Sequence, residues 1–275
     1  MSAHALALIV LTFGAAIVNG ALGYGFSSIT VPVALLFLTN RVLNPALVPI
    51  EVVLNAWVLW VNRAALPSIW RRVAPIVVGL VPGVLAGTLI VSTISPGWLK
   101  FGTYVVLLPL ILLQAAGWRR PIKAERAAGF AFGGGVGVLY SVTTISGPPL
   151  AIALNNQGVA KQEFRAALGF VRLAESSLTA AAYFYAGLFT VESGRLIPLI
   201  LPSILIGVPI GAWLIRRIRH ETFRRICMSF DAWVVAFGIS TLLQQLGLFP
   251  GARAYSVLAI VIVIDAVLLY RFFRD

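Results

Sequence analysis

The chain has 275 residues, of which 60% are hydrophobic and only 11% are charged. Soluble domains carry about 25% charged residues, so this composition excludes an ordinary water-soluble domain. The formal net charge is +12, but Lys and Arg gather in short loops between apolar runs. That distribution is typical of membrane topology rather than of nucleic-acid binding. We therefore predict an integral protein of the lipid bilayer with many helices and no nucleic-acid partner.

Apolar segments follow one another in two similar series. In chain order, they are a broken hairpin at 5–38, helices at 45–61, 73–93 and 98–117, a second broken hairpin at 127–154, helices at 164–187, 196–215 and 226–246, and a last helix at 254–271. Both hairpins are too long for one span, and the period-2 alternation of a β-barrel is absent. The predicted fold is an all-α membrane protein with two inverted repeats, 1–118 and 119–246. Each repeat is a broken or re-entrant helical hairpin plus three transmembrane helices, and 247–275 adds one more helix and a cytoplasmic tail.

Matching residues in the two series support an internal repeat. In the hairpins, the pairs Gly20 and Gly137, Leu22 and Leu139, Ser27 and Thr144, and Pro32 and Pro149 superpose at one offset. At a slightly larger offset, the matching residues are Gly83 and Gly207, Gly87 and Gly211, and Ile94 and Ile218.

Basic residues indicate how the hairpins cross the membrane. If each hairpin starts and ends on one side, one face holds sixteen basic residues: Arg63, Arg71, Arg72, Arg119, Arg120, Lys123, Arg126, Lys161, Arg165, Arg216, Arg217, Arg219, Arg224, Arg225, Arg271 and Arg274. The other face holds Arg41, Lys100, Arg195 and Arg253, and Arg172 lies within the membrane. A single crossing of 127–154 would give nine against eleven. The positive-inside rule favours the first arrangement, with a periplasmic N-terminus and a cytoplasmic C-terminus in a bacterial inner membrane.

This arrangement inverts one repeat relative to the other, as in many secondary transporters with broken helices. The N-terminus of a half-helix offers N–H groups and partial positive charge to an anion. The candidate anion ligands are Tyr24, Ser27 and Ser28 in the first hairpin and Thr143, Thr144, Ser146 and Gly147 in the second, with Ser146 as the predicted N-cap. The alternative is that the Gly, Ser and Thr residues of the hairpins only allow close helix packing.

The hairpin residues resemble the sulfite exporter TauE/SafE family of anion transporters. The resemblance rests on the Gly-rich hairpin that ends at Pro32, on the run Gly133–Gly137 leading to Gly147–Leu150, and on Glu163–Ala166. It implies a prokaryotic permease for sulfite, organosulfonates or related oxyanions. Many relatives have glycines where Tyr140–Ser146 carries hydroxyls, which puts sulfite in doubt and suits a larger or more polar anion.

Charged residues inside the predicted spans are further candidates, because a charge in the membrane normally faces a partner or a cavity. Arg172 is the predicted anion ligand, and Asn55 occupies the corresponding position of the first repeat. The alternative for Arg172 is a structural pair with Glu175. Glu51 and Glu175 are the candidate coupling acids, although Glu51 as a partner of Arg41 or as an interfacial residue is favoured. The remaining spans contain Asp231 and Asp265, which are expected to tie helices together.

The function predicted from these residues is a secondary transporter of small anions. An anion channel remains open, and so does a purely structural subunit. An intramembrane enzyme is the other alternative, but there is no His-Glu-x-x-His motif and no catalytic residue is predicted. We expect no cofactor and no metal. The coupling ion is left as a proton or sodium, and a homodimer remains open.

Overall fold

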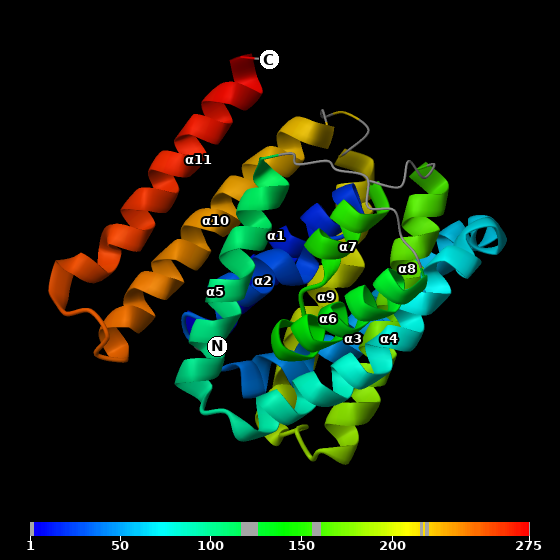
Figure 1. Ribbon diagram of the computed structural model, residues 1–275, viewed down its shortest axis with the longest axis horizontal. Helices are drawn as coiled ribbons and strands as arrows, with labels where there is room; N and C mark the ends of the chain where they lie inside the picture. Colours follow the sequence, from blue (N-terminus) through cyan, green and yellow to red (C-terminus); the bar gives the residue numbers. More distant parts are fainter. Residues whose placement is uncertain (1–2, 117–125, 156–160, 215–216, 218–219, 275) are drawn as a thin grey trace. The chain divides into compact units, whose positions relative to one another are not determined.

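The computed structural model describes residues 3–116, 126–155, 161–214, 217 and 220–274. These residues form helices joined by short turns (Figure 1). The helices are α1 (Ala3–Leu22), α2 (Phe26–Ala34), α3 (Asn40–Asn62), the short 3-10 turn η1 (Arg63–Ala65), α4 (Leu66–Thr93), α5 (Pro96–Ala115), α6 (Arg126–Thr143), α7 (Gly147–Asn155), α8 (Lys161–Tyr185), α9 (Val191–Leu214), α10 (His220–Gln245), η2 (Gly251–Tyr255) and α11 (Ser256–Arg274).

The predicted all-α membrane fold is confirmed in the described part of the chain. Six helical segments are long and apolar enough to cross a membrane: His4–Leu22, Asn40–Thr93, Pro96–Leu113, Val191–Leu214, Arg225–Gln245 and Gly251–Arg274. Both predicted breaks are present, between α1 and α2 and between α6 and α7. The protein is therefore a multi-pass membrane protein in which α1 is separated from α2, and α6 from α7, by a break in the helix.

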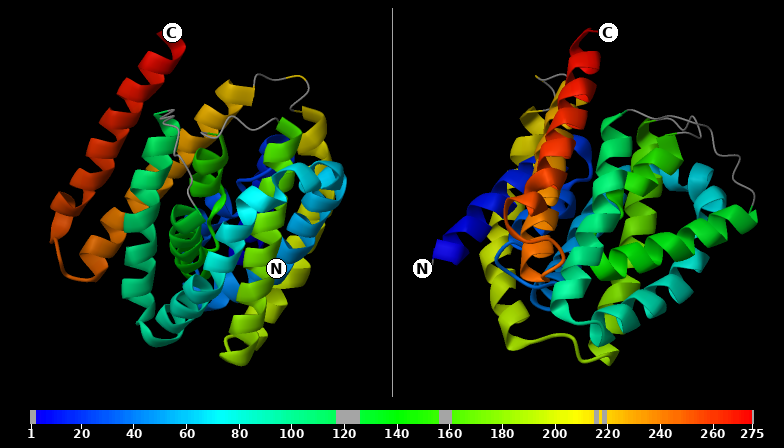
Figure 2. Two further views of the ribbon diagram at one scale, coloured as in Figure 1. Left: turned by 45° about the vertical axis from the view of Figure 1, so that its right-hand side comes forward. Right: turned by 60° about the vertical axis from the view of Figure 1, so that its left-hand side comes forward.

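The chain folds into two compact units that combine distant parts of the sequence. Unit 1 consists of Met1–Thr39, Ser95–Trp118 and Ser203–Asp275, and unit 2 of Asn40–Ile94 and Arg119–Pro202. Within unit 1, α10 packs against both α5 and α11, and Figure 2 shows α11 running alongside α10. Within unit 2, α4 packs along α6 and α3 packs along α8. The first broken hairpin belongs to unit 1 and the second to unit 2.

Glycines bring α4 and α6 into backbone contact in unit 2. A Cβ atom on Gly133 would overlap the carbonyl oxygen of Ile76, and one on Gly83 would overlap that of Gly134. A Cβ atom on Gly137 would lie 2.8 Å from the carbonyl oxygen of Leu80 and 3.0 Å from the backbone nitrogen of Val84. Small residues allow helix backbones to approach in membranes, where lipid provides little hydrophobic force between helices. These glycines therefore hold the long arm of the second hairpin against α4.

The first hairpin makes a corresponding contact in unit 1. A Cβ atom on Gly20 of α1 would overlap the backbone of Val208 on α9, and one on Gly211 would overlap the carbonyl of Ile17. Gly20 and Gly137 are paired by the hairpin offset, and Val208 and Val84 by the offset that relates Gly207 to Gly83. The repeat glycines therefore occupy matching helix contacts, Gly20 on Val208 and Gly137 on Val84.

A buried ion pair joins α10 to α11 in unit 1. Arg225 Nη2 lies 2.7 Å from Asp265 Oδ1, and both side chains are buried. Ser229 also donates to Asp265 at 3.2 Å. The expectation that Asp265 ties helices together is confirmed, whereas counting Arg225 as a loop charge is wrong. The basic residues Arg119, Arg120, Lys123, Arg216 and Arg219 lie outside the described residues.

Candidate functional site

One face of α8 carries the polar side chains of the candidate site. Arg172, Glu175, Ser176 and Thr179 stand at positions i, i+3, i+4 and i+7 of the helix, and Tyr183 follows one turn later. Residues at this spacing share a helix face. All five are buried in unit 2, with exposed fractions of at most 3%. The helix therefore presents a polar stripe to the protein interior.

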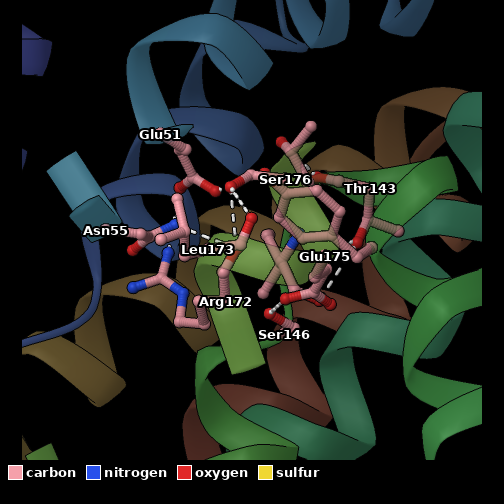
Figure 3. Close-up of polar contacts among 11 residues, drawn as sticks. Glu51, Asn55, Thr143, Ser146, Arg172, Leu173, Glu175 and Ser176 are labelled. Carbon is pink, nitrogen blue, oxygen red and sulfur yellow. Dashed lines mark hydrogen bonds and ion pairs between the residues drawn. The ribbon is translucent and has the colours of Figure 1, made fainter. Parts of the chain in front are cut away.

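Arg172 and Glu51 form a buried ion pair between α8 and α3. Arg172 Nη2 lies 3.0 Å from Glu51 Oε1, and Glu51 Oε2 accepts a hydrogen bond from the Tyr140 hydroxyl at 2.7 Å. Figure 3 shows Glu51 and Arg172 beside Asn55, whose side-chain amide donates to the carbonyl of Arg172 at 3.3 Å. Asn55 and Arg172 are therefore neighbours, as their corresponding repeat positions suggest.

Two interpretations made from the sequence are wrong at this pair. Arg172 forms its ion pair with Glu51 on another helix, not with Glu175 one turn away. Glu51 is fully buried, so it is not interfacial. Nor is it bonded to Arg41, whose guanidinium donates to the carbonyls of Val91, Ser92 and Ile94. Proximity along the helix did not decide the pairing, because α3 brings a carboxylate directly opposite Arg172.

Glu175 faces the break between α6 and α7. The Ser146 hydroxyl donates to Glu175 Oε2 at 2.5 Å (Figure 3). Glu175 Oε1, Arg172 Nε and Thr179 Oγ1 are buried and have no hydrogen-bond partner among the described residues. A buried polar atom without a partner is costly, so such an atom calls for a structural or functional explanation. The polar stripe thus retains unused donor and acceptor capacity.

The carbonyl groups at the end of α6 are hydrogen-bonded by other side chains. The Tyr183 hydroxyl donates to Ser141 O, and Asn44 Nδ2 donates to Val142 O at 2.7 Å. The Thr143 and Thr144 hydroxyls donate to Leu139 O and Thr143 O, each at 2.7 Å. Irregular backbone in a membrane protein must satisfy its polar groups internally or line a polar cavity. Side chains of α3 and α8 therefore stabilise the break.

The backbone turns sharply at Thr144, which has a φ of 55°. This left-handed conformation is uncommon for a residue with a β-branched side chain and costs about 1–3 kcal/mol. After the turn, α7 begins at Gly147, and Leu150 N donates to Ser146 O at 3.1 Å. Ser146 therefore precedes α7 as predicted, but its hydroxyl donates to Glu175. The hydroxyls of Thr143, Thr144 and Ser146 are engaged with protein acceptors, so an anion would compete with these bonds.

The first hairpin has a similar turn in unit 1. Gly23 and Gly25 have φ values of 84° and 110° on either side of the buried Tyr24. Ser27 and Ser28 are buried in the first turn of α2. The first residue after the helix is Gly23 in the first hairpin and Thr144 in the second, whereas the sequence comparison pairs Thr144 with Ser27. Helix α6 therefore continues further beyond Gly137 than α1 continues beyond Gly20.

Sequence reasoning missed several groups around Arg172. The sequence marks Tyr140 only as part of a hydroxyl-rich run, and Asn44, Thr179 and Tyr183 are not among the residues predicted from it. The spacing of Thr179 and Tyr183 after Arg172 and Glu175 provides a signal, since it extends one polar face through a predicted span. Nothing local marks Asn44 or Tyr140, because their partners lie on other helices.

No curated protein and no solved structure shows a significant match to the chain. The family model described as sulfite exporter TauE/SafE matches residues 8–238. Because this match covers most of the chain, the protein belongs to the sulfite exporter TauE/SafE family and is a membrane transport protein.

Proposed function

We propose that the protein is a secondary transporter of small sulfur oxyanions, with Arg172 as the residue that binds the anion. The substrate class is an organosulfonate or sulfite, and the site lies in unit 2 beside the break between α6 and α7. The observation that carries this proposal is a buried guanidinium on the face of α8 that reaches the helix break through Glu175, with Nε lacking a partner among the described residues.

The cost of burying Arg172 inside a membrane protein supports a functional role. Charged side chains buried in membrane proteins are costly, and such residues usually mark substrate or ion pathways. A guanidinium offers two parallel N–H donors that match the oxygens of a sulfonate or carboxylate. Arg172 uses Nη2 to bind Glu51 and leaves Nε available.

The break supplies the second part of the proposed site. Ser146 and Gly147 stand at the N-terminal end of α7, where partial positive charge favours an anion. Pro148 and Pro149 have no backbone N–H, so only Gly147 and the neighbouring hydroxyls can donate there. The proposed donors are therefore a guanidinium and several hydroxyl groups, with few backbone N–H groups. We propose a sulfonate as the anion that suits this set of donors. Tyr24, Ser27 and Ser28 lie in the first hairpin, which belongs to unit 1. Their contact with the same anion stays a prediction.

A binding screen of the purified protein tests this function. We expect binding of sulfoacetate, other sulfonates or sulfite in preference to sulfate and carboxylates, measured by isothermal titration calorimetry. Charge-assisted hydrogen bonds contribute about 1.5–3 kcal/mol each, so Arg172→Gln should weaken binding by about tenfold or more. Arg172→Lys should recover binding only in part, because the planar fork is lost.

The matched control is Arg253→Gln in η2, where the side chain is exposed. This variant should bind the anion as the unmodified protein does. Folded Arg172→Gln protein that binds with unchanged affinity would contradict the proposed site. Flux in proteoliposomes that saturates and shows counter-transport distinguishes a transporter from a channel, whose conductance does not saturate in this way.

A further inference from the structure

The carboxyl groups around Arg172 oppose the binding of an anion to its guanidinium. The buried cluster contains one guanidinium, Arg172, and two carboxyl groups, Glu51 and Glu175. Glu51 already occupies Arg172 Nη2, while Tyr140 donates to its other oxygen. An anion bound at Arg172 would lie beside the Glu51 carboxylate, and two like charges in a buried site repel strongly.

No other described basic side chain of unit 2 is shown in contact with this cluster. Arg41 and Arg63 donate to backbone carbonyls, and Arg165 precedes Arg172 by two helical turns. On α4, which also packs against α3, the basic residues are the exposed Arg71 and Arg72. Among the described residues, Glu51 interacts with Arg172 and Glu175 on α8 and with Tyr140 on α6. Uptake of a cation together with the substrate would offset the added negative charge.

The hydrogen bonds of the break favour a proton over a metal cation. Transporters that bind sodium use unwound backbone carbonyls as ligands. Of the unwound residues, Ile145 O accepts a hydrogen bond from the Thr143 hydroxyl at 3.3 Å, and Ser146 O accepts one from Leu150 N at 3.1 Å. The last carbonyls of α6, from Leu139 to Thr143, also accept hydrogen bonds from protein groups. A sodium ion would have to displace several of these bonds, whereas a proton needs only a carboxylate oxygen.

We propose that Glu51 is a proton-binding residue that couples proton uptake to anion binding, an inference that rests on the proposed function. In the unliganded site, the Glu51 carboxylate acts as the counter-ion of Arg172. The anion replaces it on the guanidinium, and Glu51 takes one proton from the aqueous side to become a neutral carboxylic acid. When the anion leaves, Glu51 releases the proton and forms the ion pair again. One proton therefore moves with each anion, in the same direction.

Calorimetry of sulfonate binding tests this coupling without any substitution. The number of protons taken up is obtained by titrating the unmodified protein in buffers of different ionisation enthalpy. We expect about one proton per anion, with affinity falling about tenfold per pH unit as the pH rises through the range of uptake. Uptake should occur equally in sodium and potassium buffers.

Variants identify the carboxyl group. Glu51→Gln should bind the anion without proton uptake and with affinity independent of pH, whereas the exposed control Glu192→Gln should keep uptake at one proton. Tyr140→Phe serves if Glu51→Gln does not fold. It removes a hydrogen bond to the Glu51 carboxylate, so uptake should persist to higher pH.

The outcomes separate this inference from the function on which it rests. Arg172-dependent binding without proton uptake contradicts the coupling but leaves the transporter proposal intact, and so does binding that requires sodium instead. Full uptake by folded Glu51→Gln protein excludes Glu51. Failure of the unmodified protein to bind any sulfur oxyanion at any pH contradicts the proposed function, and the coupling with it.

Discussion

At the scale of single residues, two buried Arg–carboxylate pairs differ in what surrounds them. Arg225 and Asp265 also bind Ser229, and their pair joins two consecutive helices of unit 1. Arg172 and Glu51 lie beside a helix break, with the partly unpartnered Glu175 close by. Buried pairs alone are weak evidence for function, since many are structural. The break beside Arg172 is what distinguishes the proposed anion site.

Substitution of Arg225 tests the structural assignment of its pair. Arg225→Gln should lower the free energy of unfolding by about 3 kcal/mol, because it leaves Asp265 buried without its cation. The double variant Arg225→Met/Asp265→Leu should recover most of that loss. Thermal unfolding in detergent measures both, and sulfonate affinity should stay unchanged. A double variant that is no more stable than Arg225→Gln would contradict this assignment.

At the scale of helices, glycine positions determine how the broken hairpins pack. Gly133 faces the backbone of α4, whereas a Cβ on Gly135, two residues later, would meet nothing within 4 Å. A glycine within a helix costs stability relative to alanine unless a close approach requires it. Gly133 satisfies that requirement, and Gly135 does not.

The two glycines therefore provide a matched pair of substitutions on one helix. Gly133→Ala should lower the midpoint of thermal unfolding by about 5 °C or more, because the new methyl group separates α6 from α4. Gly135→Ala should leave the midpoint unchanged or raise it slightly, since alanine is the better helix former. Equal midpoints for the two variants would show that the close approach of α6 to α4 does not limit stability.

At the scale of the whole molecule, the compact units do not follow the halves of the sequence. Each unit combines one broken hairpin with helices from the other predicted repeat, as in the contacts of Gly20 with Val208 and of Gly137 with Val84. Inverted repeats with broken helices occur in many secondary transporters. The inverted orientation itself stays a prediction from the distribution of basic residues.

Labelling of single introduced cysteines tests that orientation. The unmodified chain has one cysteine, the buried Cys227, which is replaced first. The introduced cysteine of Arg253→Cys or Arg195→Cys should react with an impermeant reagent from the periplasmic side. The introduced cysteine of Arg63→Cys or Arg217→Cys should not react from that side. Labelling of Arg63→Cys and Arg253→Cys proteins from the same side of the membrane would contradict the predicted topology.

The sequence by itself determined the membrane class, the helix order, both breaks and the candidate role of Arg172. These features depend on local composition, because apolar length predicts spans and glycine or hydroxyl clusters predict interruptions. Only the tertiary structure decided that Arg172 pairs with Glu51, 121 positions away, and that Arg225 is buried against Asp265. Tyr140 and Asn44 likewise acquire their roles from partners on other helices. The physical reason is that a buried charge binds whichever opposite charge the helix packing brings nearest, and separation along the chain does not encode that packing.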